Sequence, residues 1–465
     1  MTGTVELPVW VLVLVLLFAA VAALDRVLVP SARWFLRRRM EKVVARLNER
    51  LARPIEPFKL ARREDMIQRL LYDPEVSRAV VEHARKNGLR EDVAFEQAER
   101  YAREIVPRFS ATTYFGIGIR LAKWLANALY RVRQGFIDEG SLRVIDPDAT
   151  IVFIINHRSN MDYVLVTYLA ARASALSYAV GEWARVWPLF RLIQAMGAFF
   201  IRRKSRGALY RKVLARYVRM ATEGGVTQAV FPEGGLSRDG KLAEPKLGLL
   251  SYIVEGALES GRDVVFVPVA LNYDRVLEDR ILMATANNDS DRFDAPMSVV
   301  SKFILHQLSL RLRGRFHRYG YASVSFGTPL SLAEFRKSNS DEALTEALGR
   351  EMMDRISHVM PVLPVPLIAR LLLAAEGPVP RDMLLKQAET FIATLENAHL
   401  HLPRSDVDYM LEVGLRALVE RHMIVETPEG FSAAESERQA LAFYANSISH
   451  VQDPHSQGKE HIVRD

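Results

Sequence analysis

The chain has 465 residues, 49% hydrophobic and 25% charged, a composition that excludes a disordered protein and predicts two or three globular domains. It contains no cysteine, which excludes a disulfide scaffold, a cysteine-ligated metal site and a thiol nucleophile. The 62 lysines and arginines exceed the 55 aspartates and glutamates, and the net charge of +7 predicts an anionic partner: nucleic acid, a phospholipid surface or a phosphorylated substrate.

The first predicted element is a transmembrane anchor. Leu7 to Leu24 form an 18-residue segment without a charged side chain, at the lower limit for crossing a hydrocarbon core of about 30 Å. Residues 1–6 contain no lysine or arginine, so the basic start of a signal peptide is missing. Basic residues follow the segment, which predicts an external N-terminus and a cytoplasmic remainder: Arg26, Arg33, Arg37, Arg38, Arg39 and Lys42. A buried core helix is the alternative.

Residues 25–110 are polar with helical spacing, so we expect a helical region there. One face of the next expected helix carries an apolar stripe: Ile117, Leu121, Trp124, Leu125, Ala128 and Leu129. Arg120 and Lys123 lie near the stripe, as they would on a helix that contacts an anionic membrane surface. Packing against the protein core is the more common role of such a stripe, and we expect that role here.

Short apolar runs alternate with helical stretches between about residues 145 and 330, which is typical of an α/β domain. The clearest strands are expected at 151–155, 226–231, 264–269 and 321–326, and helices at 163–173, 205–223 and 246–260. Residues 376–465 indicate a small helical domain. Within it a hairpin is expected over Met423–Ser432, with its turn at Pro428, Glu429 and Gly430.

The strongest chemical signal begins where the first expected core strand ends, at His157-Arg158-Ser159-Asn160-Met161-Asp162. Ser159 and Asp162 have the spacing of a capping box, so a helix is expected to start here. A strand–turn–helix lets His157 and Asp162 converge at the carboxyl edge of the sheet, where α/β proteins bind ligands. A carboxylate behind a histidine fixes the tautomer of the ring and stabilises its cation. The pair is a candidate for catalysis, although a His and an Asp near one turn are usually structural.

Three later segments strengthen this candidate. GAFFIRR over 197–203 places Arg202 and Arg203 after an apolar run, and FPEGGLSR over 231–238 combines glycines with Ser237 and Arg238. VPV over 267–269 closes a third strand. Arginine suits phosphate because its planar fork donates two parallel hydrogen bonds, and glycines let backbone N–H groups approach an anion. The alternative without a function is a solvated basic face for the first segment and an ordinary turn for the second.

Together and in this order, HRSNMD, GAFFIRR, FPEGGLSR and VPVALNY resemble the four sequence blocks of the glycerolipid acyltransferases. The chain is most similar to the membrane-bound glycerol-3-phosphate acyltransferase branch, which includes the dihydroxyacetone-phosphate acyltransferases. The resemblance runs from about Ser110 to Gly327, and the C-terminal YANSI over 444–448 also looks like that branch. It implies an α/β, mixed-sheet acyltransferase domain over 111–335. This domain follows the anchor (1–24) and the helical region (25–110) and precedes a mainly helical C-terminal domain (336–465).

The resemblance implies transfer of a fatty acyl group from acyl-CoA or acyl carrier protein to the sn-1 hydroxyl of glycerol 3-phosphate. His157 would be the general base and Asp162 would orient it and stabilise its cation. The other expected site residues would hold the phosphate (Arg202, Arg203 and Arg238), bind acceptor hydroxyls (Glu233), help to shape the pocket (Glu233, Gly234 and Ser237) and border the acyl site (Pro268). No metal or other cofactor is expected.

The expected partners are therefore glycerol 3-phosphate, the acyl donor and membrane phospholipid, with no nucleic acid. The expected location is the cytoplasmic face of the inner membrane, where the lipid product is used. Dihydroxyacetone phosphate and lysophosphatidate remain as alternative acceptors. A basic, membrane-tethered nucleic-acid-binding or scaffold protein is the alternative from another class.

Overall fold

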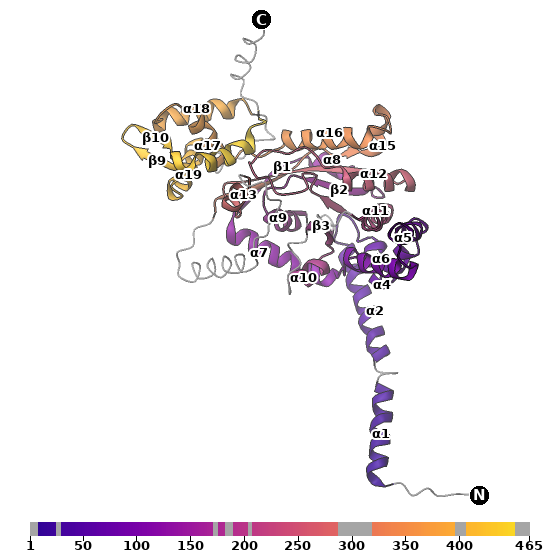
Figure 1. Ribbon diagram of the computed structural model, residues 1–465. Helices are drawn as coiled ribbons and strands as arrows, with labels where there is room; N and C mark the ends of the chain where they lie inside the picture. The colour runs from indigo at the N-terminus through magenta and orange to yellow at the C-terminus, as the bar shows by residue number, and fades with distance from the viewer. Residues whose placement is uncertain are drawn as a thin grey trace, which may run out of the picture. The chain divides into compact units, whose positions relative to one another are not determined.

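The computed structural model describes residues 8–24, 29–170, 175–181, 189–202, 207–286, 319–395 and 406–451. The contacts among residues divide the chain into two compact units, Met1–Ile55 and Glu56–Asp465. The first unit contains the helices α1 (Val9–Ala23) and α2 (Val29–Asn48). The second contains the sheet, the helices around it and the C-terminal helices (Figure 1).

The apolar segment near the N-terminus forms a shorter helix than the sequence predicted. α1 has 15 residues and begins after Pro8, which stands at its N-cap, so it replaces the expected 18-residue span over 7–24. At 1.5 Å per residue such a helix is about 22 Å long, against a hydrocarbon core of about 30 Å. Among the described residues no helix combines the length and the apolar character needed to cross a membrane, so the transmembrane anchor expected over 1–24 is not found.

A mixed sheet of eight strands organises the second unit. Its order is β1-β7-β6-β2-β5-β3-β4, with β8 beside β6. The strands β6, β2, β5, β3 and β4 pair in parallel, whereas β7 pairs antiparallel with β6 and parallel with β1. The bounds are β1 (Arg131–Ile137), β2 (Thr150–Ile155), β3 (Ser177–Gly181), β4 (Phe199–Ile201), β5 (Gln228–Val230), β6 (Val264–Tyr273), β7 (Tyr321–Phe326) and β8 (Leu330–Ser331). The expected α/β fold with a mixed sheet is confirmed.

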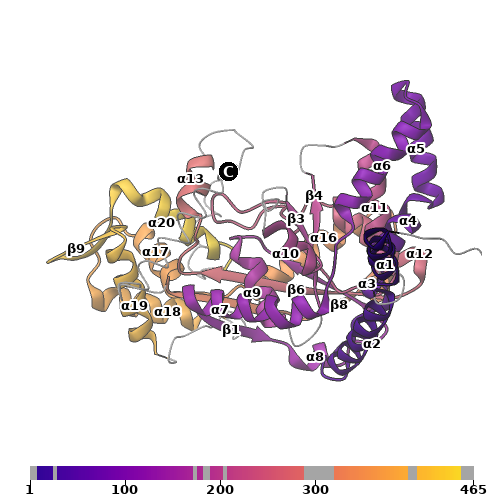
Figure 2. The same cartoon turned by 90° about the horizontal axis from the view of Figure 1, so that it is seen from below.

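Helices cover both faces of this sheet, so its central strands are buried on both sides (Figures 1 and 2). In β2, Ile151, Phe153 and Ile155 belong to one apolar cluster, and Val152 and Ile154 belong to the other. This alternation follows from the two-residue period of a strand, and it explains why β2 reads as a continuous apolar run. The four strands expected from such runs are found as β2, β5, β6 and β7.

The helices can be grouped by the cluster they contribute to. The first cluster contains residues of α7 (Ile119–Leu129), α9 (Met161–Ala170), α17 (Pro364–Ala374), α18 (Arg381–Ala393), α19 (Val407–Glu420) and α20 (Arg438–Ala445). The second contains residues of α4 (Arg63–Leu71), α5 (Pro74–Asn87), α6 (Glu91–Ile105), α11 (Ala208–Glu223), α12 (Gly248–Ser260) and α16 (Leu344–His358). The C-terminal helices thus share a core with the sheet, and the expected hairpin is confirmed as β9 (Ile424–Thr427) and β10 (Gly430–Ala433).

Shorter elements connect these helices and strands. They are α3 (Pro57–Leu60), η2 (Thr113–Gly118), α8 (Glu139–Arg143), α10 (Leu189–Ala195), α13 (Asp279–Ala286), α15 (Leu332–Phe335), η4 (Arg336–Ser338), η6 (Glu435–Glu437) and η7 (Asn446–Ile448).

The apolar stripe around α7 divides into two parts. Its C-terminal part packs against the core as expected, with Ala128 and Leu129 buried. Its N-terminal part does not, because Ile117, Leu121 and Trp124 are 60%, 43% and 52% exposed. The expectation that the whole stripe packs against the core was therefore wrong for this half. The small residues Ala122 and Ala126 face inward instead, which lets α7 approach α9 closely.

Candidate active site

The site is built on the connection between β2 and α9. β2 ends at Ile155, α9 begins at Met161, and the intervening loop is buried at the carboxyl edge of the central strands. Ser159 organises the helix start: its hydroxyl accepts a hydrogen bond from the Met161 N–H at 3.1 Å, and its own N–H donates to Asp162 Oδ2 at 3.0 Å. The expected cap at Ser159 is therefore present, and Asp162 lies in the first turn of α9 as predicted.

The structure brings His157 and Asp162 together. His157 Nδ1 lies 2.9 Å from Asp162 Oδ2, and the two residues are 2% and 0% exposed. Oδ2 also accepts the backbone N–H of Arg158 at 2.7 Å, in addition to that of Ser159. A carboxylate can only accept, so Nδ1 carries the proton and the lone pair of the neutral ring is on Nε2. Among the described residues, Nε2 has no hydrogen-bond partner, which leaves it available to take a proton.

Aromatic side chains hold the imidazole ring in place. The ring centroid of His157 lies 4.2 Å from that of Phe231 and 5.5 Å from that of Tyr163. Phe231 follows β5 and Tyr163 lies in α9, so elements on two sides of the loop fix the ring. A fixed ring keeps Nε2 in one place, which a general base requires.

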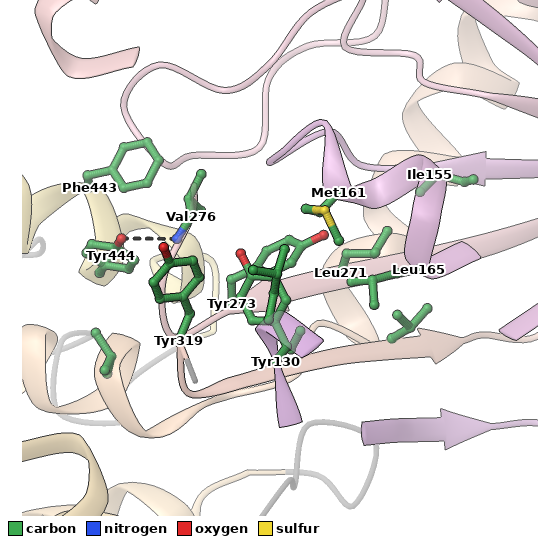
Figure 3. Packing of buried hydrophobic residues seen from close by; sticks show 14 of the residues in the cluster. Tyr130, Ile155, Met161, Leu165, Leu271, Tyr273, Val276, Tyr319, Phe443 and Tyr444 are labelled. Atoms are coloured by element: carbon green, nitrogen blue, oxygen red, sulfur yellow. Dashed lines mark hydrogen bonds between the residues drawn. The ribbon is translucent and has the colours of Figure 1, made fainter. Parts of the chain in front are cut away.

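Tyr273 contacts this pair, and sequence reasoning assigned it no role. Its hydroxyl donates to Asp162 Oδ1 at 2.5 Å from the end of β6, so both oxygens of Asp162 are engaged. Burial raises the pKa of Tyr273 well above its ordinary value, and its hydroxyl remains a donor. The ring packs against Tyr130 among the buried side chains of the first apolar cluster (Figure 3). The only sequence signal was its place at the end of the VPVALNY segment.

Glu278 holds the other side of the loop, and it too was missed. Its carboxylate accepts the Ser159 hydroxyl at 2.8 Å, the Asn160 N–H at 3.2 Å and the Asn160 side-chain amide at 3.0 Å. Burial raises the pKa of Glu278 above its ordinary value, although these donors oppose the rise. Because the Ser159 hydroxyl is committed to Glu278, Ser159 serves the loop structure and is a poor candidate for a nucleophile.

The FPEGGLSR segment supports the backbone of the His157 loop. Glu233 Oε1 accepts the His157 N–H at 2.7 Å, and the His157 carbonyl accepts the Ser237 N–H at 2.9 Å. Glu233 Oε2 accepts the Ala243 N–H at 3.2 Å, so backbone donors engage both carboxylate oxygens. Gly234 has a φ of +67°, and a Cβ there would lie 2.6 Å from Lys246 Cδ, so this turn requires glycine. The structure thus places Glu233, Gly234 and Ser237 beside the candidate base.

Arg158, inside the HRSNMD motif, ties the loop to the C-terminal region. Its buried guanidinium donates to the carbonyl oxygens of Gly240 and Ser447, the second at 3.3 Å. Burial lowers the pKa of Arg158, and the charges of Glu233 and Asp162 oppose this shift. The YANSI segment over 444–448 therefore contributes directly to the support of the active-site loop.

The three expected phosphate ligands have different surroundings. Arg238 follows Ser237 directly and is half-buried beside the His157 loop. Arg202 follows β4, three strands from β2 or about 14 Å across the sheet, and its guanidinium pairs with Glu104 at 2.6 Å. Arg203 lies outside the described residues. Of the two described arginines, Arg238 is the one whose backbone adjoins the His157 loop.

Pro268 lies within β6, where it is buried opposite Ile154 of β2. Its carbonyl accepts the Gly327 N–H at 2.9 Å. This position is in the sheet below the loop that carries His157. A role for Pro268 at the border of an acyl site stays a prediction.

The mixed α/β fold and the buried His157–Asp162 pair agree with the acyltransferase domain that a family model identifies. The family model described as Acyltransferase matches residues 138–272, a segment that contains both residues. A second model, described as Glycerol-3-phosphate acyltransferase C-terminal region, matches residues 307–454, which include the YANSI segment.

Curated relatives agree with these two matches. Two proteins named glycerol-3-phosphate acyltransferase, from Pseudomonas syringae pv. tomato and Ectopseudomonas mendocina, align with 84% of this chain. Their sequence identities over the aligned segment are 26% and 27%. The two family matches and these relatives support the glycerol-3-phosphate acyltransferase family that the four motifs predicted. The chain spans about half the length of these relatives, 49% of each.

Among solved structures, the chain has a weak likeness to a 1-acyl-sn-glycerophosphate (LPA) acyltransferase from Thermotoga maritima. The TM-score is 0.30 at 20% identity, with coverage of 52% of this chain and 77% of that chain. A likeness of this size supports no inference about the substrate.

Proposed function

We propose that this chain transfers a fatty acyl group from a thioester donor to the sn-1 hydroxyl of glycerol 3-phosphate, giving lysophosphatidate for phospholipid synthesis. The observation that carries the proposal is the buried His157–Asp162 pair with Nε2 open, set in a chain of this family. The name of the relatives supplies the acceptor, and acyl-CoA and acyl carrier protein are the two candidate donors.

The geometry supports direct transfer. Nε2 of His157 takes the proton of the acceptor hydroxyl as its oxygen attacks the thioester carbonyl. Asp162 stabilises the imidazolium that forms, and the Tyr273 hydroxyl holds Asp162 in place. When the tetrahedral intermediate collapses, the C–S bond breaks and the imidazolium returns its proton to the leaving thiolate. The products are the acylated acceptor and the free thiol carrier, and no acyl–enzyme intermediate is needed.

Phosphate recognition is assigned to Arg238 and Arg203, with Arg202 as the third candidate. Arg238 has the strongest support because its backbone adjoins Ser237, which donates to the His157 carbonyl. Glu233 cannot itself favour a phosphate, and its role as a ligand of the acceptor hydroxyls is part of the proposal. Gly234 and Ser237 shape the turn that connects Glu233 to Arg238. Pro268 would border the acyl chain.

Replacement of Arg238 by alanine tests the acceptor site. We expect the KM for glycerol 3-phosphate to rise about ten- to a hundredfold, because a charge-assisted hydrogen bond contributes roughly 1.5–3 kcal/mol. The KM for the acyl thioester should change little, since its reacting end carries no charge. The measurement is a steady-state assay with labelled glycerol 3-phosphate and with acyl-CoA or acyl carrier protein as donor. Arg143→Ala, which removes an exposed arginine of α8, is the matched control.

An equal rise of both KM values in Arg238→Ala would contradict the assignment and indicate a general anionic surface. Arg202 needs a second comparison, because Arg202→Ala also breaks the ion pair with Glu104. Glu104→Gln weakens that pair and leaves the arginine in place, so a phosphate role requires an acceptor effect in Arg202→Ala alone. Dihydroxyacetone phosphate and lysophosphatidate, assayed as acceptors in parallel, test the alternative substrates.

We also propose that the enzyme meets its lipid product at the cytoplasmic face of the inner membrane. Support comes from the outward half of the α7 stripe, where Ile117, Leu121 and Trp124 are exposed beside Arg120 and Lys123. Apolar side chains with flanking cations suit the interface of an anionic bilayer. α7 lies beside α9, the helix that carries Asp162 (Figure 2).

Serine in place of Ile117, Leu121 and Trp124 together should lower binding to phosphatidylglycerol vesicles at least tenfold, because each apolar side chain contributes about 1.5–3 kcal/mol when fully buried. Vesicle flotation of the full chain measures this. The control variant replaces Val144, Leu258 and Val425, which are also exposed, by serine. Equal binding of the two triple variants would show that the α7 face does not contact the membrane.

A further inference from the structure

A pocket lies far from His157. It has a volume of about 320 Å³ and is bounded by the segment 58–63 and the segment 106–109. Val226, which also lines it, precedes β5, while the contacts described below reach residues just before β3 and β4. The pocket therefore adjoins the amino-terminal edge of these parallel strands, whereas His157 lies at the carboxyl edge. The length of the strands puts on the order of 20 Å between the two places.

Four cationic side chains line this pocket: Lys59, Arg62, Arg63 and Arg108. Within the described part of the chain, none of them forms an ion pair with a carboxylate. Nearby cations do: Arg103 pairs with Glu99. Glu64, next to Arg63 in the sequence, lies outside the pocket lining and forms no ion pair in the described structure, although its charge raises the pKa of Arg63. Four cations in one pocket without an ion-paired carboxylate point to an anionic ligand.

Lys59 forms the inner wall. Its ammonium donates one hydrogen bond, to the carbonyl oxygen of Ala175 at 2.7 Å, and lies 4.7 Å from the centre of the Phe109 ring. Burial lowers the pKa of Lys59 well below its ordinary value. An ammonium has three donors, so two remain for a ligand after the bond to Ala175. The Cε atom of Lys59 also lies close to Gly197, where any side chain would crowd it.

The arginines form the rest of the wall and the rim. Arg63 has a structural role as well: its Nε donates to the Val106 carbonyl at 3.0 Å, just beyond the end of α6. Burial lowers the pKa of Arg63, as does the charge of Arg108. Arg62 and Arg108 are exposed. Arg62 is also the N-cap of α4, a position where no side chain caps the helix, so the partial positive charge of the helix end adds to that of the side chains.

We propose that this pocket binds a phosphate-bearing ligand, which is a second anion site separate from the acyl-transfer centre. Convergent guanidinium forks suit phosphate oxygens, and the volume exceeds what one phosphate group needs. Phe58 and Phe109 give the pocket an apolar wall against which the remainder of the ligand would pack. Two sources share this chemistry: a soluble phosphate compound and a phospholipid headgroup.

Calorimetric titration of the full chain with inorganic pyrophosphate tests the site. The variant replaces Arg62 and Arg108 together by alanine, two exposed side chains for which the described structure records no side-chain hydrogen bond. The control replaces Arg143 and Lys386, which are exposed elsewhere, and removes the same charge. We expect pyrophosphate binding to weaken at least tenfold in the first variant, since bonds to charged groups contribute roughly 1.5–3 kcal/mol each. In the control it should change less than twofold.

Two further arms identify the source and keep the site separate from catalysis. If the binding to phosphatidylglycerol vesicles falls with that of pyrophosphate in the Arg62/Arg108 variant, the ligand is a lipid headgroup. If only pyrophosphate binding falls, it is a soluble phosphate. The affinity of the pocket for pyrophosphate should be unchanged in His157→Ala, so this test does not depend on acyl transfer. Equal affinities of the variant and the control for both probes would overturn the proposal.

Discussion

His157→Ala is expected to remove nearly all acyl transfer. General-base catalysis by a positioned side chain contributes about 10²–10⁴-fold, and the structure provides no other described group that holds an open ring nitrogen at this loop. The KM values should change little, because the expected role of His157 is in proton transfer. The measurement is single-turnover transfer of a labelled acyl group to glycerol 3-phosphate.

The loss must be separated from a folding defect, since His157 is buried against Phe231. His157→Gln keeps more of the side-chain volume but cannot act as the base, so it should be equally inactive with a thermal unfolding midpoint near that of the parent. His358→Ala, which removes an exposed histidine of α16, is the control and should retain full activity. Transfer within tenfold of the parent in both His157 variants would contradict the assignment of the base.

The parts of the fold that the sequence predicted are those where burial leaves a local pattern. β2 and β6 lie between two helical layers, so their side chains are apolar on both faces, and continuous runs of β-branched residues mark them. The loop after β2 was predicted from a second local signal: Ser159 and Asp162 mark the start of α9 by their spacing alone. Local sequence thus placed the candidate pair His157 and Asp162 at the carboxyl edge of the sheet, where the structure has it.

The parts that were missed depend on partners far away in the sequence. β1 carries Arg131 and Arg133 and lies at the edge of the sheet, so it has no apolar run to reveal it. Tyr273 reaches Asp162 across 111 residues, and only the pairing of β6 with β2 brings them together. The same holds for Arg202, whose partner Glu104 is 98 residues away in a region that the sequence described only as helical. No spacing rule reports such contacts.

The α1 segment illustrates a different limit. The sequence contains a run of 18 uncharged residues, but the helix that forms there has 15 residues and starts after Pro8. Composition alone does not state where a helix begins, and for a segment near the minimum spanning length a few residues decide the interpretation. The α7 stripe was ambiguous for a related reason: helical spacing identifies one face, but only the packed structure shows which turns of that face are covered.

Asp162→Asn is expected to lower kcat by about 10²–10⁴-fold while both KM values stay near those of the parent, a loss of the size expected when a base loses its orienting group. Asp162 accepts four donors: His157 Nδ1, two backbone N–H groups and the Tyr273 hydroxyl. An asparagine has one oxygen and a donating amide, so at least one of these donors loses its acceptor. It also lacks the negative charge that stabilises the imidazolium. Activity equal to the parent would mean that Asp162 is only a helix cap.

Tyr273→Phe separates orientation from charge in the same pair, because it removes one donor and leaves the carboxylate intact. We expect a loss of about ten- to a hundredfold in kcat, since a hydrogen bond to a charged group contributes roughly 1.5–3 kcal/mol. The loss should fall on kcat, with both KM values near those of the parent, because the hydroxyl contacts Asp162 and not a substrate. A parallel rise in KM and fall in thermal unfolding midpoint would leave Tyr273 as a core residue and Asp162 as the sole support of the base.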